Sequence, residues 1–197
     1  MQIYLIRHGE VENPGDVVYA DIPGFTLSAA GRKQAEAAGK HLAGSPPQLI
    51  VSSPLDRAVA TAELIAAETG AGVVTEPRLT EWALAVRWRG ARWADLPVVF
   101  PGELEAYLAH PGDLPFCSES VTQVAERMAS AVTHWVERAD RDIAFISHQD
   151  PIHSAKLRLS GVPMNNFHDG KPAHCTVVAM QPAGPHWATV SEWSPPQ

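Results

Sequence analysis

Four side chains in this sequence have the chemistry needed to hold a phosphoryl group, and each follows an apolar run. They are Arg7, His8, Arg57 and His148. Arginine and histidine donate charge-assisted hydrogen bonds, which the non-bridging oxygens of a phosphoryl group accept. Any one of these residues alone is more often a capping or surface residue than a functional one. The prediction of a phosphoryl-binding site therefore requires that the fold bring them together.

The apolar runs that precede these side chains are typical of buried β-strands. They cover residues 2–6, 49–53 and 143–147. In an open parallel sheet, ligands bind beyond the carboxyl ends of the strands, and the helix N-termini found there present free N–H groups to an anion. The sequence therefore predicts that the three strand ends form one anion-binding pocket.

Amphipathic helices alternate with these strands along the chain. The spacing of apolar and capping residues predicts helices over 28–42, 54–69, 120–139 and 151–160, and further strands over 72–75, 174–180 and 187–193. Pro54 suits a first helical turn, and Ser120 and Gln123 have the spacing of a capping box. This alternation is typical of a mostly parallel sheet covered on both faces. We expect an α/β fold, a three-layer αβα sandwich with a mostly parallel central sheet.

The middle of the chain, around residues 82–118, departs from this alternation. It is rich in tryptophan, arginine and proline and has no clear helical or strand period. We interpret it as a lid or substrate-binding excursion from one domain that spans residues 1–197. Tryptophans interleaved with arginines would also suit stacking on single-stranded nucleic acid. The acidic balance of the whole chain favours the lid.

Composition and charge limit the partners of the protein. Of its 197 residues, 45% are hydrophobic and 19% charged, and the formal net charge is −7. A surface that binds nucleic acid or an anionic membrane needs broad positive charge, so we expect neither partner. No signal peptide and no membrane-spanning stretch is visible. The two cysteines, Cys117 and Cys175, are far apart, which is typical of reduced thiols, and we expect a cytoplasmic protein, either monomeric or homodimeric.

Several short segments resemble the signature motifs of the histidine phosphatase superfamily, in its phosphoglycerate-mutase-like branch. They occur in the family's order over most of the chain: Arg7-His8-Gly9, residues 27–35, residues 52–58, Arg78-Leu79-Thr80-Glu81, Ser118-Glu119-Ser120 and Ser147-His148. One such tripeptide is a weak signal, but the whole set in order is specific. The resemblance implies phosphoryl transfer from a small phosphomonoester, without a metal or other cofactor.

The resemblance and the residue types together imply how the reaction would run. Neutral His8 attacks phosphorus and forms a phosphohistidine, since only an unprotonated ring nitrogen has a lone pair to donate. Glu81 protonates the leaving oxygen and then activates the water that cleaves the phosphoenzyme. Glu10 and Glu76 are alternative candidates for this acid.

Five side chains are implied as ligands of the phosphoryl group: Arg7, Arg57, His148, Asn13 and Gln149. Two of them depart from the family pattern. Asn13 lies one residue earlier than the family's asparagine, and Gln149 replaces a glycine that commonly follows the second histidine. Val11 and Ser118 also replace common family residues, a threonine and a glycine.

Three other functions fit parts of the sequence. A mutase would use the same residues but return the phosphoryl group to its product. A metal hydrolase could draw ligands from one region of the chain: His148, Asp150, His153, His168 and His174. Their spacing matches no zinc motif, and we favour surface or core roles for the last three. The third alternative is a phospho-ligand-binding protein without catalysis, against which the full set of candidate catalytic residues counts.

Overall fold

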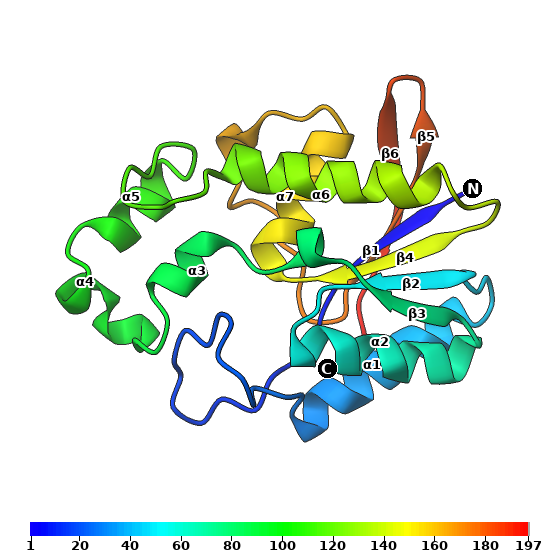
Figure 1. The fold of residues 1–197 in the computed structure, drawn as a ribbon, viewed down its shortest axis with the longest axis horizontal. Coiled ribbons are helices and arrows are strands. Elements are labelled where there is room, and N and C mark those ends of the chain that lie inside the picture. Colours follow the sequence, from blue (N-terminus) through cyan, green and yellow to red (C-terminus); the bar gives the residue numbers. More distant parts are fainter. Residues whose placement is uncertain (197) are drawn as a thin grey trace.

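A six-stranded sheet forms the centre of the computed structural model, which describes residues 1–196. The strand order is β3-β2-β4-β1-β5-β6 (Figure 1). The strands are β1 (Ile3–Arg7), β2 (Leu49–Ser52), β3 (Gly72–Thr75), β4 (Ile143–Ser147), β5 (Val177–Ala183) and β6 (His186–Trp193). The first four are mutually parallel, whereas β5 pairs antiparallel with both β1 and β6. The expected mostly parallel sheet is thus confirmed, with an antiparallel hairpin added at one edge.

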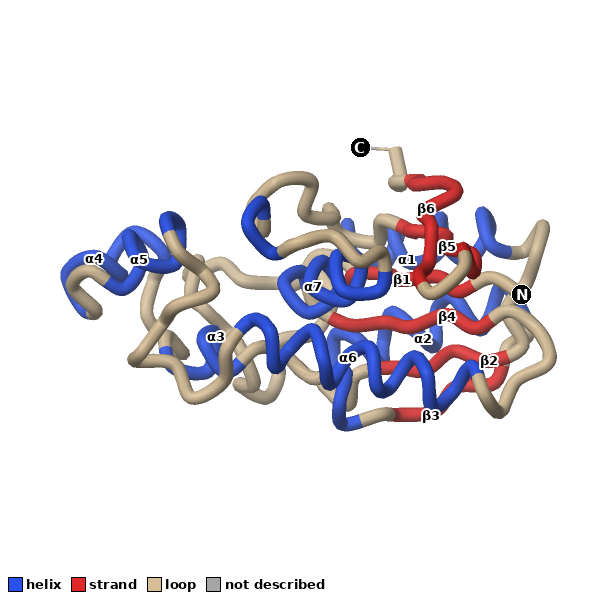
Figure 2. Tube along the Cα trace, turned by 90° about the horizontal axis from the view of Figure 1, so that it is seen from above, coloured by secondary structure: helices blue, strands red, loops and turns tan. Residues whose placement is uncertain are grey.

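Four helices cover the two faces of this sheet. Helices α1 (Ala29–Leu42) and α2 (Asp56–Thr69) pack on one face, and α6 (Val121–Val136) and α7 (Gln149–Leu159) pack on the other (Figure 2). Alternate residues of β1 and β4 point into the two separate apolar cores, because successive strand side chains point to opposite faces. Burial on both faces explains why these strands are continuously apolar. The three-layer arrangement is confirmed.

The structure moves several of the predicted element boundaries. Helix α2 begins at Asp56, with Leu55 as its N-cap, so Pro54 lies before the helix instead of in its first turn. Helix α7 begins at Gln149, which makes Pro151 its third residue, where a missing N–H costs nothing. Strand β5 begins at Val177, because Cys175 adopts a positive φ of 53° and turns the chain just before the strand.

The segment 82–118 lies beyond the carboxyl ends of the parallel strands (Figure 1). It contains three short helices that the sequence pattern did not predict: α3 (Ala83–Arg87), α4 (Leu96–Val99) and α5 (Glu103–Ala109). Trp82 and Trp88 are buried in the core. Glu103 ties the segment together, since it accepts hydrogen bonds from both Arg87 and the Trp88 indole. The role of this segment as a lid remains a prediction.

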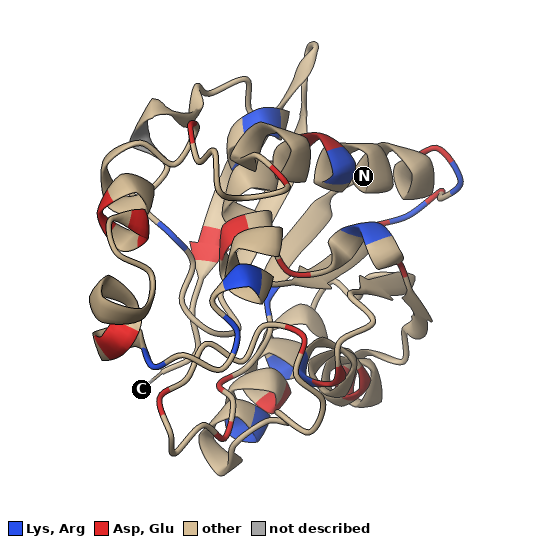
Figure 3. Ribbon diagram, turned by 60° about the vertical axis from the view of Figure 1, so that its left-hand side comes forward, with Lys and Arg blue, Asp and Glu red and all other residues tan. Residues whose placement is uncertain are grey.

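The charged residues give little support to the nucleic-acid interpretation of the tryptophan-rich segment. Arg89 pairs with Asp21, and Arg87 pairs with Glu103, so two of its arginines already have carboxylate partners. Lysine and arginine are scattered over several elements in Figure 3 and alternate with acidic residues. Within residues 1–196, no helix combines the length and apolar character that a membrane crossing would need.

Two glycines bring the chain after β1 against the start of α1. A Cβ atom at Gly31 would lie 2.0 Å from the Glu10 carbonyl oxygen, and one at Gly9 would lie 2.6 Å from the Gly31 carbonyl oxygen. Only glycine permits this contact between backbones, which fixes the loop that directly follows His8.

Gly31→Ala should therefore lower the free energy of unfolding by roughly 1–3 kcal/mol, the usual cost of overpacking a closed site. Urea unfolding followed by circular dichroism measures this change. Gly44→Ala is the matched control, because a Cβ atom there meets no atom within 4 Å. The control should stay within about 0.5 kcal/mol of the wild type. Equal stability of the two variants would show that the contact does not constrain the loop.

Candidate active site

The four predicted phosphoryl ligands meet at the carboxyl ends of the central strands. Arg57 Nε lies 3.2 Å from His8 Nε2, and Arg57 Nη2 lies 3.0 Å from His148 Nδ1. The two imidazole rings have their centroids 5.2 Å apart. Arg7 ends β1 and precedes His8 in the chain. The structure thus brings together residues that are 140 positions apart in the sequence, as the strand-end argument predicts.

The hydrogen bonds of His8 select one tautomer of its ring. Its backbone N–H donates to Ser147 O at 2.9 Å, which ties the end of β1 to the end of β4. Its ring Nδ1 lies 2.7 Å from Gly9 O, and a carbonyl oxygen only accepts, so Nδ1 carries the hydrogen. Nε2 accepts from Arg57 and therefore carries the lone pair. Burial, together with the charges of Arg57 and Arg7, lowers the pKa of His8 well below its ordinary value.

The Arg57 guanidinium is buried at the centre of the cluster. The residue lies in the first turn of α2 and is 2% exposed. Besides the two histidines, its Nη2 lies 3.6 Å from Glu81 Oε2, and its guanidinium carbon lies 4.7 Å from the centroid of the Tyr19 ring. Tyr19 also packs edge-on against the His8 ring. Sequence reasoning missed Tyr19, and no local pattern around it could have indicated this position.

His148 is fully buried and is the N-cap of α7. Because Arg57 Nη2 only donates, His148 Nδ1 accepts, and His148 Nε2–H donates to Ser53 Oγ at 2.9 Å. Burial and the neighbouring Arg57 charge hold the pKa of His148 well below its ordinary value. Ser53 thus lies in the short segment between β2 and α2, two residues before Leu55, the extended N-cap of α2.

Glu81 enters the same cluster from the loop after β3. Its Oε1 accepts from the Trp82 backbone N–H at 2.9 Å, and its Oε2 lies 3.5 Å from His148 Nδ1. Burial raises the pKa of Glu81, and the Arg57 charge opposes that change. A buried carboxyl with a raised pKa has the property required of a general acid.

Arg127 of α6 holds the backbone that presents Glu81. Its guanidinium donates to the carbonyl oxygens of Arg78, Thr80 and Glu81, and it pairs with Glu119. The sequence analysis identified Glu119 only as part of a helix start and missed Arg127. An arginine on the polar side of an amphipathic helix gives no local sign of such a contact.

The two alternative acids lie in other contacts. Glu76 binds Arg78 and accepts from the Trp135 indole, and the hydrogen bonds from Arg78 lower the pKa of Glu76 to about 2. Glu10 accepts from Ser28 Oγ at 2.7 Å at the start of α1. Neither residue lines the pocket, whereas Glu81 does.

Arg7 and the further candidate ligand Gln149 bind the same backbone carbonyl group. Arg7 Nη1 and Gln149 Nε2 both donate to the Pro172 carbonyl oxygen, at 3.2 and 3.3 Å. Arg7 Nε is buried and has no hydrogen-bond partner among the described residues, so this donor is unsatisfied in the structure. Burial lowers the pKa of Arg7, while Tyr19 and then Glu81 oppose the change.

Asn13 is the one predicted ligand that the structure does not bring into the cluster. Its amide nitrogen donates to Val17 O, and its amide oxygen accepts from Val17 N–H, at 3.0 and 3.2 Å. Both ends of the side chain thus close the loop after His8, and Asn13 is absent from the pocket lining. Its role as a phosphate ligand stays a prediction without geometric support.

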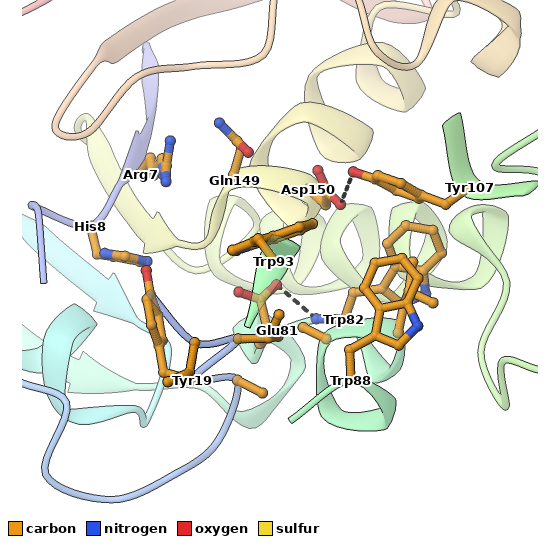
Figure 4. Close-up of a pocket in the computed structure, with 15 residues that line it drawn as sticks. Arg7, His8, Tyr19, Glu81, Trp82, Trp88, Trp93, Tyr107, Gln149 and Asp150 are labelled. Atoms are coloured by element: carbon orange, nitrogen blue, oxygen red, sulfur yellow. Dashed lines mark hydrogen bonds between the residues drawn. The ribbon is translucent and has the colours of Figure 1, made fainter. Parts of the chain in front are cut away.

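The cluster forms the base of a pocket whose far wall is aromatic (Figure 4). Arg7, His8 and Glu81 lie at the base. The wall is made mainly of Trp82, Trp88, Trp93 and Tyr107, with Gln149 and Asp150 of α7 beside them. Within residues 1–196, no three histidine, cysteine or acidic side chains are grouped closely enough to hold a metal ion. The predicted metal-hydrolase ligands therefore do not assemble in the described part of the chain.

Comparison with known proteins places this chain in a family. The histidine phosphatase superfamily (branch 1) matches residues 3–193. An uncharacterised protein of Mycobacterium tuberculosis is 34% identical over 185 residues, covering 91% of this chain and 87% of the relative. A glucosyl-3-phosphoglycerate phosphatase of Mycolicibacterium vanbaalenii is 31% identical over 175 residues, covering 84% and 77%.

Solved structures agree with the sequence relatives. A mycobacterial glucosyl-3-phosphoglycerate phosphatase in complex with VO3 has a TM-score of 0.85 and 27% identity, with 98% of each chain covered. The same mycobacterial phosphatase in complex with inorganic phosphate has a TM-score of 0.83 and 26% identity, covering 98% of this chain and 97% of that one. With the family match spanning nearly the whole sequence, this chain belongs to branch 1 of the histidine phosphatase superfamily.

Proposed function

We propose that this protein hydrolyses phosphomonoesters through a phosphohistidine on His8, without a metal ion. The observation that carries the proposal is the state of the His8 ring. Its Nδ1–H is tied to Gly9 O, so the lone pair of Nε2 points at the Arg57 guanidinium, where a phosphoryl group would bind. A nucleophile with its lone pair aimed at a cation is poised to meet a bound anion.

In the first step, His8 Nε2 attacks phosphorus in line with the leaving oxygen. A P–N bond forms, the P–O ester bond breaks, and Glu81 gives its proton to the departing oxygen. In the second step, Glu81 takes a proton from water, which attacks phosphorus and releases inorganic phosphate from His8. Arg7 and Arg57 supply the positive charge that stabilises the transferred group, a task that Mg²⁺ performs in kinases.

The tautomer of His148 can change during this cycle. Its Nδ1 accepts from Arg57, but a phosphoryl oxygen at this place would need a donor. The Ser53 hydroxyl both accepts and donates. When a phosphoryl oxygen replaces the Arg57 contact, Ser53 can donate to Nε2 while Nδ1–H turns to the phosphoryl group.

The two pKa changes favour the protonation state that the first step needs. This step requires His8 neutral and Glu81 protonated. At its ordinary pKa of 6.5, His8 would be mostly neutral only above that pH. At its ordinary pKa of 4.5, Glu81 would be mostly protonated only below that pH, so the two requirements overlap poorly. Burial lowers the pKa of His8 and raises that of Glu81, so the populations of both required forms increase together.

A mutase would share every one of these residues and differ in keeping the phosphoenzyme until the product returns. Two relatives, each matched with more than 75% of both chains covered, are named glucosyl-3-phosphoglycerate phosphatases. Their names support hydrolysis. Release of inorganic phosphate with each turnover would distinguish hydrolysis from a mutase reaction.

Rapid acid-free quenching of a reaction with ³²P-labelled p-nitrophenyl phosphate in EDTA should trap label on the protein. The label should be lost in mild acid and persist in alkali, as a phosphoramidate requires, and it should map to the peptide that contains Arg7-His8-Gly9. His8→Ala should abolish both label and turnover. His174→Ala is the matched control: it removes a neighbouring ring, 5.7 Å from the His8 ring, and should still take up label. Label that survives acid, or that needs a divalent ion, would contradict the proposal.

Glu81→Gln should slow hydrolysis of an alkyl phosphate by about 10²–10⁴-fold, the usual contribution of general acid catalysis, and slow p-nitrophenyl phosphate far less. The reason is that an alkoxide leaves only when protonated, whereas nitrophenolate leaves largely unaided. Steady-state rates on both esters give the measurement. Glu76→Gln and Glu10→Gln are controls in which the ratio of the two rates should not change. Equal slowing of both esters by Glu81→Gln would assign the proton to another residue.

At pH 6.5, His8 should be neutral and protonated on Nδ1 only, because burial and two arginines disfavour the imidazolium. Long-range ¹H–¹⁵N correlation spectra of histidine-labelled protein report this state directly, with His8→Gln used to assign the signals. An imidazolium signal, or the Nε2–H tautomer, would show that the lone pair is not available for attack.

A further inference from the structure

The pocket contains a second carboxylate that the proposed reaction does not use. Asp150 is the second residue of α7, and its carboxylate lines the pocket on the side away from His8 (Figure 4). Its Oδ2 accepts from the Tyr107 hydroxyl at 2.9 Å, and its Oδ1 accepts from Lys171 Nζ at 2.6 Å. Two fixed donors hold this carboxylate in one orientation.

The lysine that partners Asp150 is not available to a ligand. Its ammonium also donates to the Tyr107 hydroxyl at 2.6 Å and lies over the rings of Phe167 and Tyr107, 4.4 and 4.9 Å from their centroids. The Lys171 side chain is 13% exposed and is absent from the pocket lining. The ion pair therefore presents its carboxylate to the pocket and its ammonium to the protein interior.

The arginines at the pocket itself belong to the phosphoryl site. Of the lysines and arginines among residues 1–196, Arg7 lines this pocket, and Arg57 lies at the base of the pocket beside His8. Arg87 and Arg89 of the neighbouring segment are paired with Glu103 and Asp21. Within the described lining of this pocket, a leaving group with its own carboxylate or second phosphate would thus meet Asp150, while the lining arginine, Arg7, belongs to the phosphoryl site.

The electrostatic effect of Asp150 reaches the reacting groups. Burial is the main cause that raises the pKa of Glu81, and the Asp150 charge adds to it. The same charge opposes the lowering of the Arg7 pKa by burial. The Asp150 carboxylate thus acts electrostatically on both Glu81 and Arg7.

The rest of this space is apolar and flat. Trp88 and Trp93 lie edge to face, and Val18 and Leu84 complete the wall. Trp93 is 45% exposed, so its ring is open to a ligand. Flat aromatic surfaces beside an acceptor suit a ring that offers apolar C–H faces and hydroxyl donors.

We infer that the physiological substrate is the phosphomonoester of an uncharged, hydroxyl-bearing ring, with Asp150 accepting a substrate hydroxyl and rejecting leaving groups that carry negative charge. This inference rests on the proposed function, and it separates this chain from relatives that are named for a phosphoglycerate derivative. Tyr107 and Lys171 already donate to this carboxylate, so an anionic leaving group brought against Asp150 would find no donor there, and the contact is unfavourable in a desolvated site.

A matched pair of small esters tests the charge preference. Glycerol 3-phosphate and 3-phosphoglycerate both lose a primary alkoxide and differ mainly in a hydroxymethyl group against a carboxylate. We expect kcat/KM to favour the neutral ester by roughly 10- to 100-fold, the scale of unpaired like-charge contacts. Inhibition of p-nitrophenyl phosphate hydrolysis by the same two compounds gives the ranking even where their own turnover is slow. Glucose 6-phosphate and a nucleoside monophosphate then distinguish a sugar from a nucleoside as the ring.

Asp150→Asn tests the residue. The amide keeps the size of the side chain, but it removes the charge and leaves Lys171 without its carboxylate, so the preference should fall at least tenfold, which corresponds to about 1.4 kcal/mol. Asp140→Asn is the control for net charge, because this exposed residue precedes β4 at the opposite end of the sheet. Near-UV circular dichroism confirms that each variant is folded. The comparison of the two esters on the wild-type protein tests the charge preference even if a variant fails to fold.

The outcomes separate the inference from the proposed function. If both glycerol-based esters are hydrolysed through His8 at equal kcat/KM, or 3-phosphoglycerate is preferred, the inference is wrong and the proposed function stands. If the preference for the neutral ester persists unchanged in Asp150→Asn, the charge selection comes from another group and the role of Asp150 is overturned. If no ester turns over and no phosphohistidine is trapped, the proposed function itself fails, and the inference with it.

Discussion

The buried guanidinium of Arg57 is the constraint on which the site depends. A cation that is 2% exposed is very unfavourable unless acceptors surround it. Here the acceptors are one nitrogen from each of two histidine rings and a carboxylate at 3.6 Å. Each ring can accept only when that nitrogen is unprotonated, so the cation keeps both histidines neutral. The requirement to solvate one buried charge thus leaves His8 Nε2 with its lone pair, and in the proposed reaction an incoming phosphoryl group would take over the same guanidinium donors.

The fold holds this arrangement through backbone contacts more than through flexible side chains. The His8 amide is fixed to β4, its ring is fixed to the next carbonyl oxygen, and the Gly9–Gly31 contact presses the following loop against α1. On the other side of the pocket, Arg127 donates to the backbone carbonyl oxygens of Arg78, Thr80 and Glu81. Catalytic groups on strand ends and helix starts lose little entropy on binding, because their supports are rigid before the ligand arrives.

The sequence allowed the sheet, its covering helices and the meeting of Arg7, His8, Arg57 and His148 to be predicted, because these follow from apolar periodicity and from the geometry of parallel strands. Three kinds of feature could not be predicted. Helix α2 starts after an extended Leu55, and the nearby Ser53 binds His148 in a tertiary contact that no local pattern indicates. Tyr19 and Arg127 enter the site from segments whose local patterns are ordinary. The helices of segment 82–118 are short and are fixed by ion pairs and buried tryptophans, so the sequence shows no helical spacing of apolar residues that would predict them.

Two carboxylates occupy one pocket, and their partners explain why they would divide the work. Both oxygens of Asp150 accept short hydrogen bonds, from a hydroxyl and from an ammonium group, so a proton there would displace a donor. Glu81 uses one oxygen to accept a backbone N–H and holds the other 3.5–3.6 Å from its nearest cationic or imidazole neighbours, beyond normal hydrogen-bond distance. In the proposed reaction that second oxygen is the one that would take and release the proton, at the cost of its ion-pair contact with Arg57. Asp150, with both oxygens already accepting hydrogen bonds, would instead act on the identity of the leaving group.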